Sequence, residues 1–255
     1  MFKISKYVLY DILRNKVVLA YTAFLLVISI SLFQMEENSS KAMLSMLNIV
    51  LIVVPLISIV FATIHFYNSY EFIEMMLAQP IDRKVIFLAE YFAVAMSLSV
   101  AFLLGVGIPS LLFGAGTSTF TLLFCGTILS IVFTSLAFLS SVLTRDKAKA
   151  IGIALLFWFY FSLIYDGLLL WIIYSFSDYP LEKVTLSLIA FNPVDLARII
   201  MLLKLDISAL MGYTGAFYKD FLGNWTGTLF SVGVLALWAT VPIAIALQIF
   251  RKKDL

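Results

Sequence analysis

The sequence SYEFIEMMLAQPIDR, residues Ser69–Arg83, decides how the rest of the chain is arranged. It is polar enough to leave a lipid bilayer, yet it lies between two long apolar runs. At 100° per residue, its large apolar side chains share one helix face, while Glu71 and Glu74 lie on the other. Pro80 ends this pattern, because the residue before a proline disfavours the α conformation. The stretch predicts a short amphipathic helix docked at a membrane face, with an apolar side of Phe72, Ile73, Met76 and Leu77.

Composition places the remainder of the chain in a membrane. Hydrophobic residues make up 63% and charged residues 13%, with a mean hydropathy of +1.06, whereas soluble domains are about one half apolar and one quarter charged. The single cysteine, Cys125, excludes an internal disulfide and a Cys-rich metal cluster, and we interpret it as a packing residue. We therefore expect one all-α, polytopic transmembrane domain over residues 1–255.

Six apolar runs come close to or exceed the length of about 17 to 25 residues that crosses a bilayer. Residues 1–16 are basic and amphipathic, which predicts a helix in the membrane interface that leads into the first span. No small-residue cleavage site follows this segment, so the first span is expected to stay in the membrane as an anchor. Residues 177–227 form the only long loop. The expected spans lie at about residues 17–33, 43–65, 85–113, 119–143, 151–176 and 228–250.

Proline and glycine predict local departures from straight helix within two of the spans. Pro55 removes one backbone hydrogen bond from the second span and is expected to kink it. Gly105, Gly107 and Pro109 favour a bend or an unwound turn in the second half of the third span. Ala101 and Gly105 are four residues apart, a spacing of small residues that permits close contact with another helix.

The placement of Lys and Arg predicts that both termini lie in the cytoplasm. With that orientation, twelve of the seventeen basic residues fall inside, and among short loops and termini only Lys41 falls outside. Ser69–Arg83 and the basic loop Thr144–Ala150 are then cytoplasmic, and residues 177–227 are outside.

The outer loop carries its own helix signals. Asn192 followed by Pro193 is typical of an N-cap and a first helical residue, and Asp195 is favourable in the first turn. Asp206 or Ser208 is a candidate cap for a further helix. We expect short helices that lie on the outer face and form a lid or a docking surface.

No catalytic constellation is visible in the sequence. The chain lacks a Gly-rich phosphate loop followed by Lys, so it is not expected to hydrolyse ATP. A Ser–His pair for intramembrane proteolysis would need His65, the single histidine, which we interpret instead as an interfacial residue at a span end.

Asp166 is the most informative charge within a span. An aspartate at a span centre costs about 2.5 to 3.5 kcal/mol on insertion scales, and Asp166 is displaced toward the outer half. Two interpretations stay open: a pathway or helix-locking residue in the bundle interior, or an interfacial residue paired with water or Tyr165.

Three methionines surround the first outer loop, namely Met35, Met43 and Met46. Thioethers bind Cu(I), so a copper relay is conceivable. Methionine is also an ordinary core residue, and neither His nor Cys joins the group. No metal site is therefore expected.

The chain resembles the permease subunits of ABC-2 type transporters. The resemblance is carried by the entry segment YDILRNK, the phrase LAQPIDRKVIF, the arrangement of six spans and the terminal RKK. In that family an acidic residue and several leucines precede Pro-x-x-Arg, which Glu74, Leu77, Pro80 and Arg83 match. The usual upstream Glu-x-Gly-Thr is absent, since residues 70–72 read Tyr-Glu-Phe. This departure weakens the similarity to drug and polysaccharide exporters.

A narrower resemblance covers most of the chain. The Tyr165-Asp166 pair before GLLLWII and the phrase FNPVDLARII at 191–200 are similar to the NosY group of permeases, which serve the maturation of nitrous oxide reductase. The resemblance implies a homodimer in the bacterial inner membrane, in contact with lipid and not with nucleic acid. Two copies of a separate ATPase subunit would hold ATP and Mg, with no cofactor on this chain.

The resemblance also assigns contacts to particular residues. A periplasmic accessory protein, and with it a copper chaperone, would meet the outer loop at Asn192, Pro193, Asp195 and Arg198. Coupling to the ATPase would involve Glu71, Phe72, Ile73, Glu74, Met76, Leu77, Pro80, Arg83, Arg145, Asp146 and Lys147. The implied function is export of a sulfur species or mechanical action on periplasmic partners.

Two other functions remain compatible with the sequence. One is a generic ABC-2 exporter of lipid, drug or peptide. The other is a non-transporting membrane scaffold that is moved by ATP hydrolysis. The sequence does not identify the cargo, because the polarity of a pore depends on helix packing.

Overall fold

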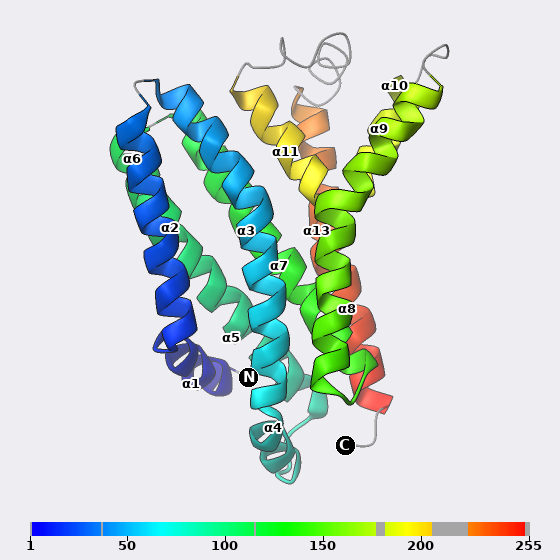
Figure 1. The fold of residues 1–255 in the computed structure, drawn as a ribbon. Helices are drawn as coiled ribbons and strands as arrows, with labels where there is room; N and C mark the ends of the chain where they lie inside the picture. Colours follow the sequence, from blue (N-terminus) through cyan, green and yellow to red (C-terminus); the bar gives the residue numbers. More distant parts are fainter. Residues whose placement is uncertain (1, 37, 115, 177–181, 206–223, 253–255) are drawn as a thin grey trace.

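The computed structural model describes residues 2–36, 38–114, 116–176, 182–205 and 224–252. Over these residues the regular structure is entirely helical (Figure 1). In chain order the elements are α1 (Phe2–Leu13), α2 (Lys16–Met35), α3 (Ser39–Asn68), α4 (Tyr70–Leu77), α5 (Arg83–Phe102), η1 (Leu103–Gly107), α6 (Ile108–Phe113), α7 (Thr117–Leu143), α8 (Lys147–Phe159), η2 (Tyr160–Ile164), α9 (Tyr165–Ser175), α10 (Glu182–Ala190), α11 (Pro193–Lys204) and α13 (Trp225–Lys252), where η1 and η2 are π-helical turns.

Within the described residues, six helical segments are long and apolar enough to cross a membrane, which confirms the predicted fold class. Their helices extend beyond the apolar runs. The second span begins at Ser39 and not at residue 43, because the Asn38 side chain accepts a hydrogen bond from Ser40 N and caps the helix there. The segments cover residues 16–35, 39–68, 83–113, 117–143, 147–175 and 226–252.

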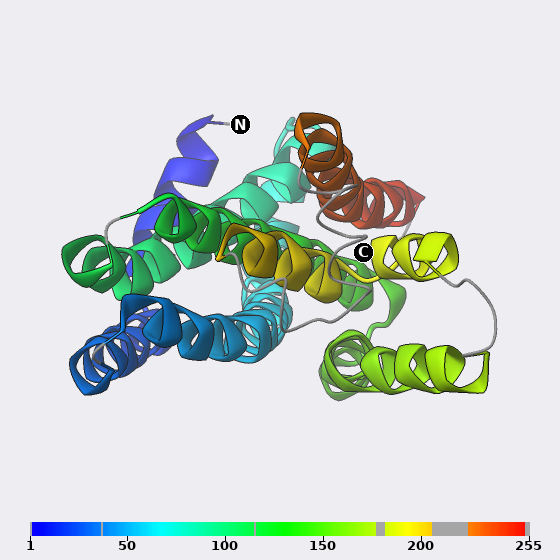
Figure 2. The same ribbon diagram turned by 90° about the horizontal axis from the view of Figure 1, so that it is seen from above.

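The spans form a bundle with two distinct ends (Figure 1). Both termini, α1 and α4 lie at one end, which we call the α4 end, and α10 and α11 lie at the opposite, α11 end. Helix α7 is the most buried of the six spans and contacts α3, α5, α8, α11 and α13. Seen from above, α11 lies over the middle of the bundle (Figure 2).

The third span unwinds where its glycines and proline predict. A π-helical turn occupies Leu103–Gly107, directly before α6. A methyl group on Gly105 would lie 2.7 Å from Leu25 Cβ and 2.9 Å from Thr22 O, so the predicted close contact with another helix is confirmed and α2 is the partner. Helix α3, by contrast, runs as one element of 30 residues through Pro55.

Gly126 in α7 makes the tightest contact of the described glycines. A methyl group at this position would lie 2.1 Å from Phe102 Cζ, inside the ring's own volume. We predict that Gly126→Ala destabilises the detergent-solubilised protein by about 1–3 kcal/mol, because a well-packed core resists added volume. Thermal unfolding measures this.

The matched control is Gly152→Ala in α8, where nothing lies within 4 Å of the added methyl group. Alanine favours helix over glycine by about 1 kcal/mol, so this control is expected to be neutral or stabilising. Equal unfolding midpoints for the two variants would contradict the packing described for α7.

Candidate functional site

Helix α4 confirms the short amphipathic helix predicted for the opening stretch. It spans Tyr70–Leu77 between two spans, and Glu71 and Glu74 are exposed. Its apolar face packs on the chain's own core: Ile73 is 2% exposed, and Phe72, Met76 and Leu77 pack against the same core. Ile73, which the resemblance assigns to coupling with the ATPase, is therefore covered by the bundle and not open to a partner. The side open to a partner presents Glu71, Glu74 and Met75.

The Pro-x-x-Arg phrase forms the turn that returns the chain from α4 to the membrane. Pro80 follows the end of α4, and Ile81 packs against the core. The Asp82 side chain accepts a hydrogen bond from Lys84 N at 3.0 Å and caps α5. Arg83 is therefore the first residue of α5 and lies exposed beside α4. The spacing of the phrase follows from this helix–turn–helix geometry.

A second exposed segment, Thr144–Lys147, lies beside the end of α3. Tyr67 Oη lies 3.1 Å from both Ser141 O and Thr144 O, and its single proton is shared between these two carbonyl groups. Lys147 Nζ donates to Asn68 Oδ1 at 2.8 Å. The last turn of α3 thus holds the Thr144–Lys147 segment, and the residues that follow α3 in the chain begin α4.

Arg145, Asp146 and Lys147, predicted from the sequence to face the same side as α4, are all exposed here. The Asp146 side chain accepts a hydrogen bond from Lys149 N at 2.9 Å and caps α8. Tyr67 and Asn68, which join the two segments, were missed by sequence reasoning because they lie just beyond the predicted end of the second span at residue 65, whereas α3 continues to Asn68. We call α4 together with Thr144–Lys147 the paired face.

An aromatic cluster lies directly behind the paired face. Phe66 of α3 makes edge-to-face contacts with Phe87 of α5 and Phe138 of α7, at ring-centroid distances of 6.3 and 5.4 Å. Phe250 of α13 stacks on Phe87 at 4.7 Å. Four spans therefore meet in one close-packed group next to the residues that hold both exposed segments.

His65 and Glu90 form a buried polar pair in the same region. His65 Nε2 lies 3.2 Å from Glu90 Oε2, and Ser69 Oγ lies 3.2 Å from the same nitrogen. The Glu90 side chain is 2% exposed and that of His65 is 10% exposed, so His65, in the last turn of α3, is covered by protein and paired with a carboxylate. Glu90 was missed, although a lone carboxylate inside the apolar third span was a usable signal.

At the α11 end, Asn192 caps its helix as predicted, but the helix is not on the outer surface. The Asn192 side chain accepts a hydrogen bond from Val194 N at 3.0 Å. Asn192, Pro193 and Asp195 are all buried, and α11 packs against α7 and α13. These three residues are therefore not exposed for a periplasmic partner, which corrects that expectation. Arg198 is partly exposed.

The physical reason is that the apolar face of α11 meets protein. Val194, Ala197 and Met201 belong to the main core, and α10 and α11 meet at a bend of 114° that turns α11 toward the bundle. The helix expected to begin at Asp206 or Ser208 lies outside the described residues.

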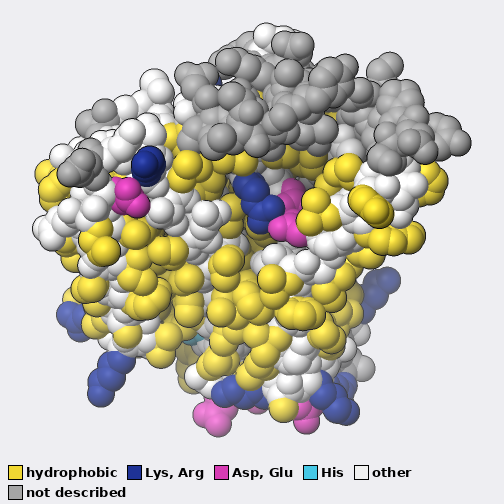
Figure 3. Space-filling model, turned by 45° about the horizontal axis from the view of Figure 1, so that its top comes forward, with side chains coloured by type: hydrophobic (Ala, Val, Ile, Leu, Met, Phe, Trp, Pro, Cys, Tyr) yellow, Lys and Arg dark blue, Asp and Glu magenta, His cyan; other side chains and the backbone are white. Residues whose placement is uncertain are grey.

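Asp166 finds its partner on α11. Its Oδ2 lies 2.8 Å from Arg198 Nη1, and Asp195 Oδ1 lies 3.0 Å from the same nitrogen. Its partner within the protein is thus Arg198 of α11, a contact between two helices that favours the helix-locking interpretation. Figure 3 shows basic and acidic side chains meeting in a hollow of the otherwise apolar surface near the α11 end.

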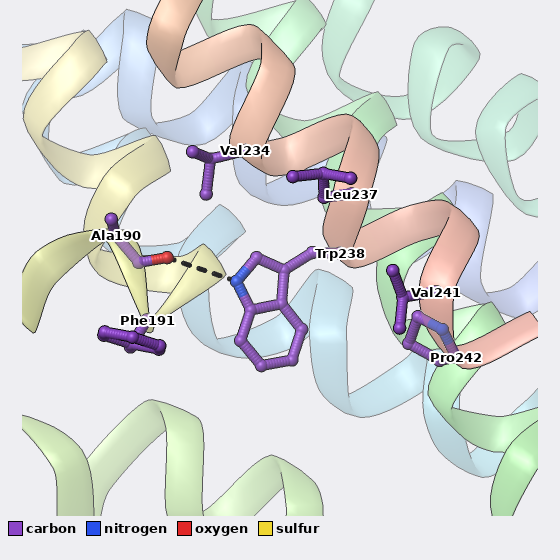
Figure 4. A pocket seen from close by; sticks show the side chains of 7 residues that line it. All are labelled: Ala190, Phe191, Val234, Leu237, Trp238, Val241 and Pro242. Atoms are coloured by element: carbon purple, nitrogen blue, oxygen red, sulfur yellow. Dashed lines mark hydrogen bonds between the residues drawn. The ribbon is translucent and has the colours of Figure 1, made fainter. Parts of the chain in front are cut away.

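An apolar cavity of about 340 Å³ separates the α10–α11 corner from α13. Trp238 of α13 extends into it and donates from Nε1 to Ala190 O at 3.3 Å (Figure 4). This bond ties the corner of the hairpin to the last span. The cavity is lined by Ala190, Phe191, Val234, Leu237, Trp238, Val241 and Pro242.

The methionines near the turn between α2 and α3 have different environments. Met43 and Met46 are buried in the core, whereas Met35 is 81% exposed at the end of α2. Met46 Sδ accepts a hydrogen bond from Ser29 Oγ at 3.5 Å. Core packing thus accounts for Met43 and Met46. Among the described residues, no group of three His, Cys, Asp or Glu side chains is arranged to hold a metal ion.

Residues 4–255 match the family described as ABC-2 family transporter protein. The chain belongs to this family. The ABC-2 permease is accordingly an integral membrane protein, with six candidate membrane-spanning helices among its described residues. Two curated relatives are each named "Probable ABC transporter permease protein NosY". One, from Pseudomonas aeruginosa, is 27% identical over 197 residues, covering 71% of this chain and 68% of the relative. The other, from Stutzerimonas stutzeri, is 25% identical over 267 aligned residues, covering 96% of this chain and 90% of the relative.

The Tyr67 hydroxyl is expected to hold Thr144–Lys147 in the ABC-2 permease. We predict that Tyr67→Phe accelerates tryptic cleavage after Arg145 and Lys147 by about two- to tenfold, since a typical intramolecular hydrogen bond contributes about 0.5–1.5 kcal/mol. Tyr70→Phe is the matched control at the start of α4. Unchanged cleavage in Tyr67→Phe would show that its hydroxyl does not restrain the segment.

The His65–Glu90 pair yields a double-mutant prediction. His65→Leu leaves the buried Glu90 carboxyl group without its partner, and removing one member of a buried pair costs about 3–5 kcal/mol. Adding Glu90→Leu is expected to restore most of this stability, because both polar groups are then gone. Thermal unfolding of the two single variants and the double variant checks this, and additive losses would argue against the pairing.

Proposed function

We propose that this ABC-2 permease is the membrane subunit of a NosY-type complex, in which two copies pair with two copies of a separate ATPase subunit. The proposal is supported by the two relatives, one of which is covered over 90% of its length. It is also supported by the phrase FNPVDLARII, whose Asn192, Asp195 and Arg198 all take part in contacts at the α11 end.

The α4 end is the cytoplasmic end in this proposal. Basic residues concentrate there, in keeping with the bias of cytoplasmic loops toward Lys and Arg. Both termini and the paired face lie at that end. The chain then resides in the bacterial inner membrane, with α10 and α11 on the periplasmic side.

The paired face is the observation that carries the proposal. Two exposed segments that are distant in sequence are held by consecutive residues of α3, through Tyr67 and through the Asn68–Lys147 bond. An ATPase subunit that binds either segment therefore pulls on the same helix end. The aromatic cluster behind it passes that displacement to four spans, because close-packed interiors transmit strain as a body.

The work done at the periplasmic side has two candidate forms. In one, the complex exports a sulfur species for nitrous oxide reductase. In the other, it acts mechanically on a periplasmic accessory protein or a copper chaperone. Transport by vesicles that contain permease and ATPase subunit distinguishes them, since only export accumulates cargo. Asn192 and Asp195 are buried, so a partner has to meet exposed residues of that side, such as Val184 and Phe191.

Substitutions that change the charge on the exposed side of α4 test whether the paired face is the contact with the ATPase subunit. We predict that Glu74→Lys or Met75→Asp weakens binding of the ATPase subunit by roughly tenfold, about 1.4 kcal/mol, with little change in folding because both side chains are exposed. Binding is measured with the two purified subunits in detergent or nanodiscs.

Glu36→Lys supplies the matched control, because it makes the same charge change at the α11 end. It is expected to bind like the unaltered permease. If the unaltered permease binds no ATPase subunit from its own genome, the proposed function is wrong. If all three variants bind equally well, the paired face is not the contact.

A further inference from the structure

The outer half of the fifth span is weakly attached to the bundle. This span consists of α8, η2 and α9, and the described part of α9 contains no buried residue. In Figure 1, α8 runs upright along the bundle, whereas α9 leans away from it beyond η2. The change of direction thus coincides with the π-helical turn Tyr160–Ile164.

A π-helical turn is a natural pivot. It interrupts the regular i to i−4 hydrogen bonds, and sharp helix bends occur at such turns. At this turn Phe161 O accepts a hydrogen bond from Asn192 Nδ2 at 2.9 Å, so α11 satisfies the carbonyl group at the pivot itself. Asn192 is fully buried, which keeps this contact away from water.

Beyond the pivot, two side-chain hydrogen bonds connect α9 to the hairpin, and Leu169 packs against the small apolar cluster that includes Ile189 and Leu196. Arg198 Nη1 donates to Asp166 Oδ2 at 2.8 Å, and Tyr165 Oη donates to Leu188 O of α10 at 2.6 Å. The hairpin of α10 and α11 therefore makes one hydrogen bond at the π-helical turn and two hydrogen bonds to α9, the arm above this turn.

The hairpin itself is firmly placed. Val194, Ala197 and Met201 lie in the main core, and Trp238 of α13 bonds to Ala190 O at the corner. Of the two sides of the contact, α9 is thus the one with less packing within this chain.

The charge arrangement allows α9 to detach without leaving the partly exposed Arg198 unpaired. Arg198 Nη1 is shared between Asp166 and Asp195, so Arg198 keeps one carboxylate when Asp166 leaves. Asp195 also accepts a hydrogen bond from Asn192 Nδ2 at 2.8 Å, which holds it in place. The Asp166 side chain is 30% exposed and lies in the outer half of the span, where it can exchange Arg198 for water.

From these contacts we propose that Arg198 and Asp166 form a releasable latch, and that α9 swings about η2 as an arm when the latch opens. Asn192 keeps its hydrogen bond to the π-helical turn and so holds the bend at that position. The proposal concerns the motion of this chain alone and depends neither on the cargo nor on the ATPase subunit.

Distance measurements between paired spin labels test the latch in the full chain in nanodiscs. Cys125→Ala first removes the only native cysteine. One label pair replaces Tyr174 of α9 and Thr117 of α7, both exposed, and reports on the arm. A reference pair replaces Met35 and Thr117, which lie at the same end but outside the fifth span.

The expected result is one distance for the arm pair in the unaltered protein and an added longer-distance population in Asp166→Asn and in Arg198→Gln. Combining the two changes should add nothing further, because either one already opens the latch. Lys204→Gln, which removes an exposed basic residue from the same helix, is the matched control and should resemble the unaltered protein.

Two results would overturn the proposal. An unchanged arm distance in Asp166→Asn would mean that the pair does not hold α9. Equal changes in the arm and reference distances would mean that the pair maintains the whole fold and is not a latch. Asp166→Asn is the decisive variant, since it leaves Arg198 with Asp195 and therefore disturbs α11 least.

Discussion

The structure depends on one constraint: a polar group within the hydrocarbon layer has no water to bind and must find its partner inside the protein. Three such polar contacts join pairs of helices in this structure. The π-helical turn of the fifth span is joined to α11 through Asn192 and Phe161 O. The end of α7 is joined to α3 through the Tyr67 hydroxyl. Glu90 is joined to the second span through His65.

These joints give the two ends of the bundle different mechanical character. At the α4 end, rings from α3, α5, α7 and α13 interlock behind the paired face. At the α11 end, α9 has no buried residue and is held by a few polar contacts. A displacement at the closely packed α4 end can therefore produce a larger movement of α9 at the α11 end.

Local features of this chain could be predicted from its sequence, whereas the identity of the surface that each feature meets could not. The spans, α4, the Asn192 cap and the unwound turn near Gly105 follow from hydropathy and from backbone preferences of a few adjacent residues. The amphipathic pattern of α11 is equally visible, but it does not tell whether the apolar face meets lipid, a partner or the chain's own core. Ile73 and Asp195 were assigned to partners for that reason, and both are buried within the bundle. Likewise, the pairs His65–Glu90 and Asp166–Arg198 join residues 25 and 32 positions apart, which no local pattern specifies.

Glu90 also bears on how the chain enters the membrane during synthesis. A carboxylate within a span is costly to insert, by about 2.5 to 3.5 kcal/mol at the span centre. Segments are made from the N-terminus onward, so the second span, with His65 near its end, is available before the third span emerges with Glu90. Because of this order, His65 is already present when the Glu90 carboxylate enters the membrane. A permuted chain in which the third span came first would have to insert that carboxylate alone.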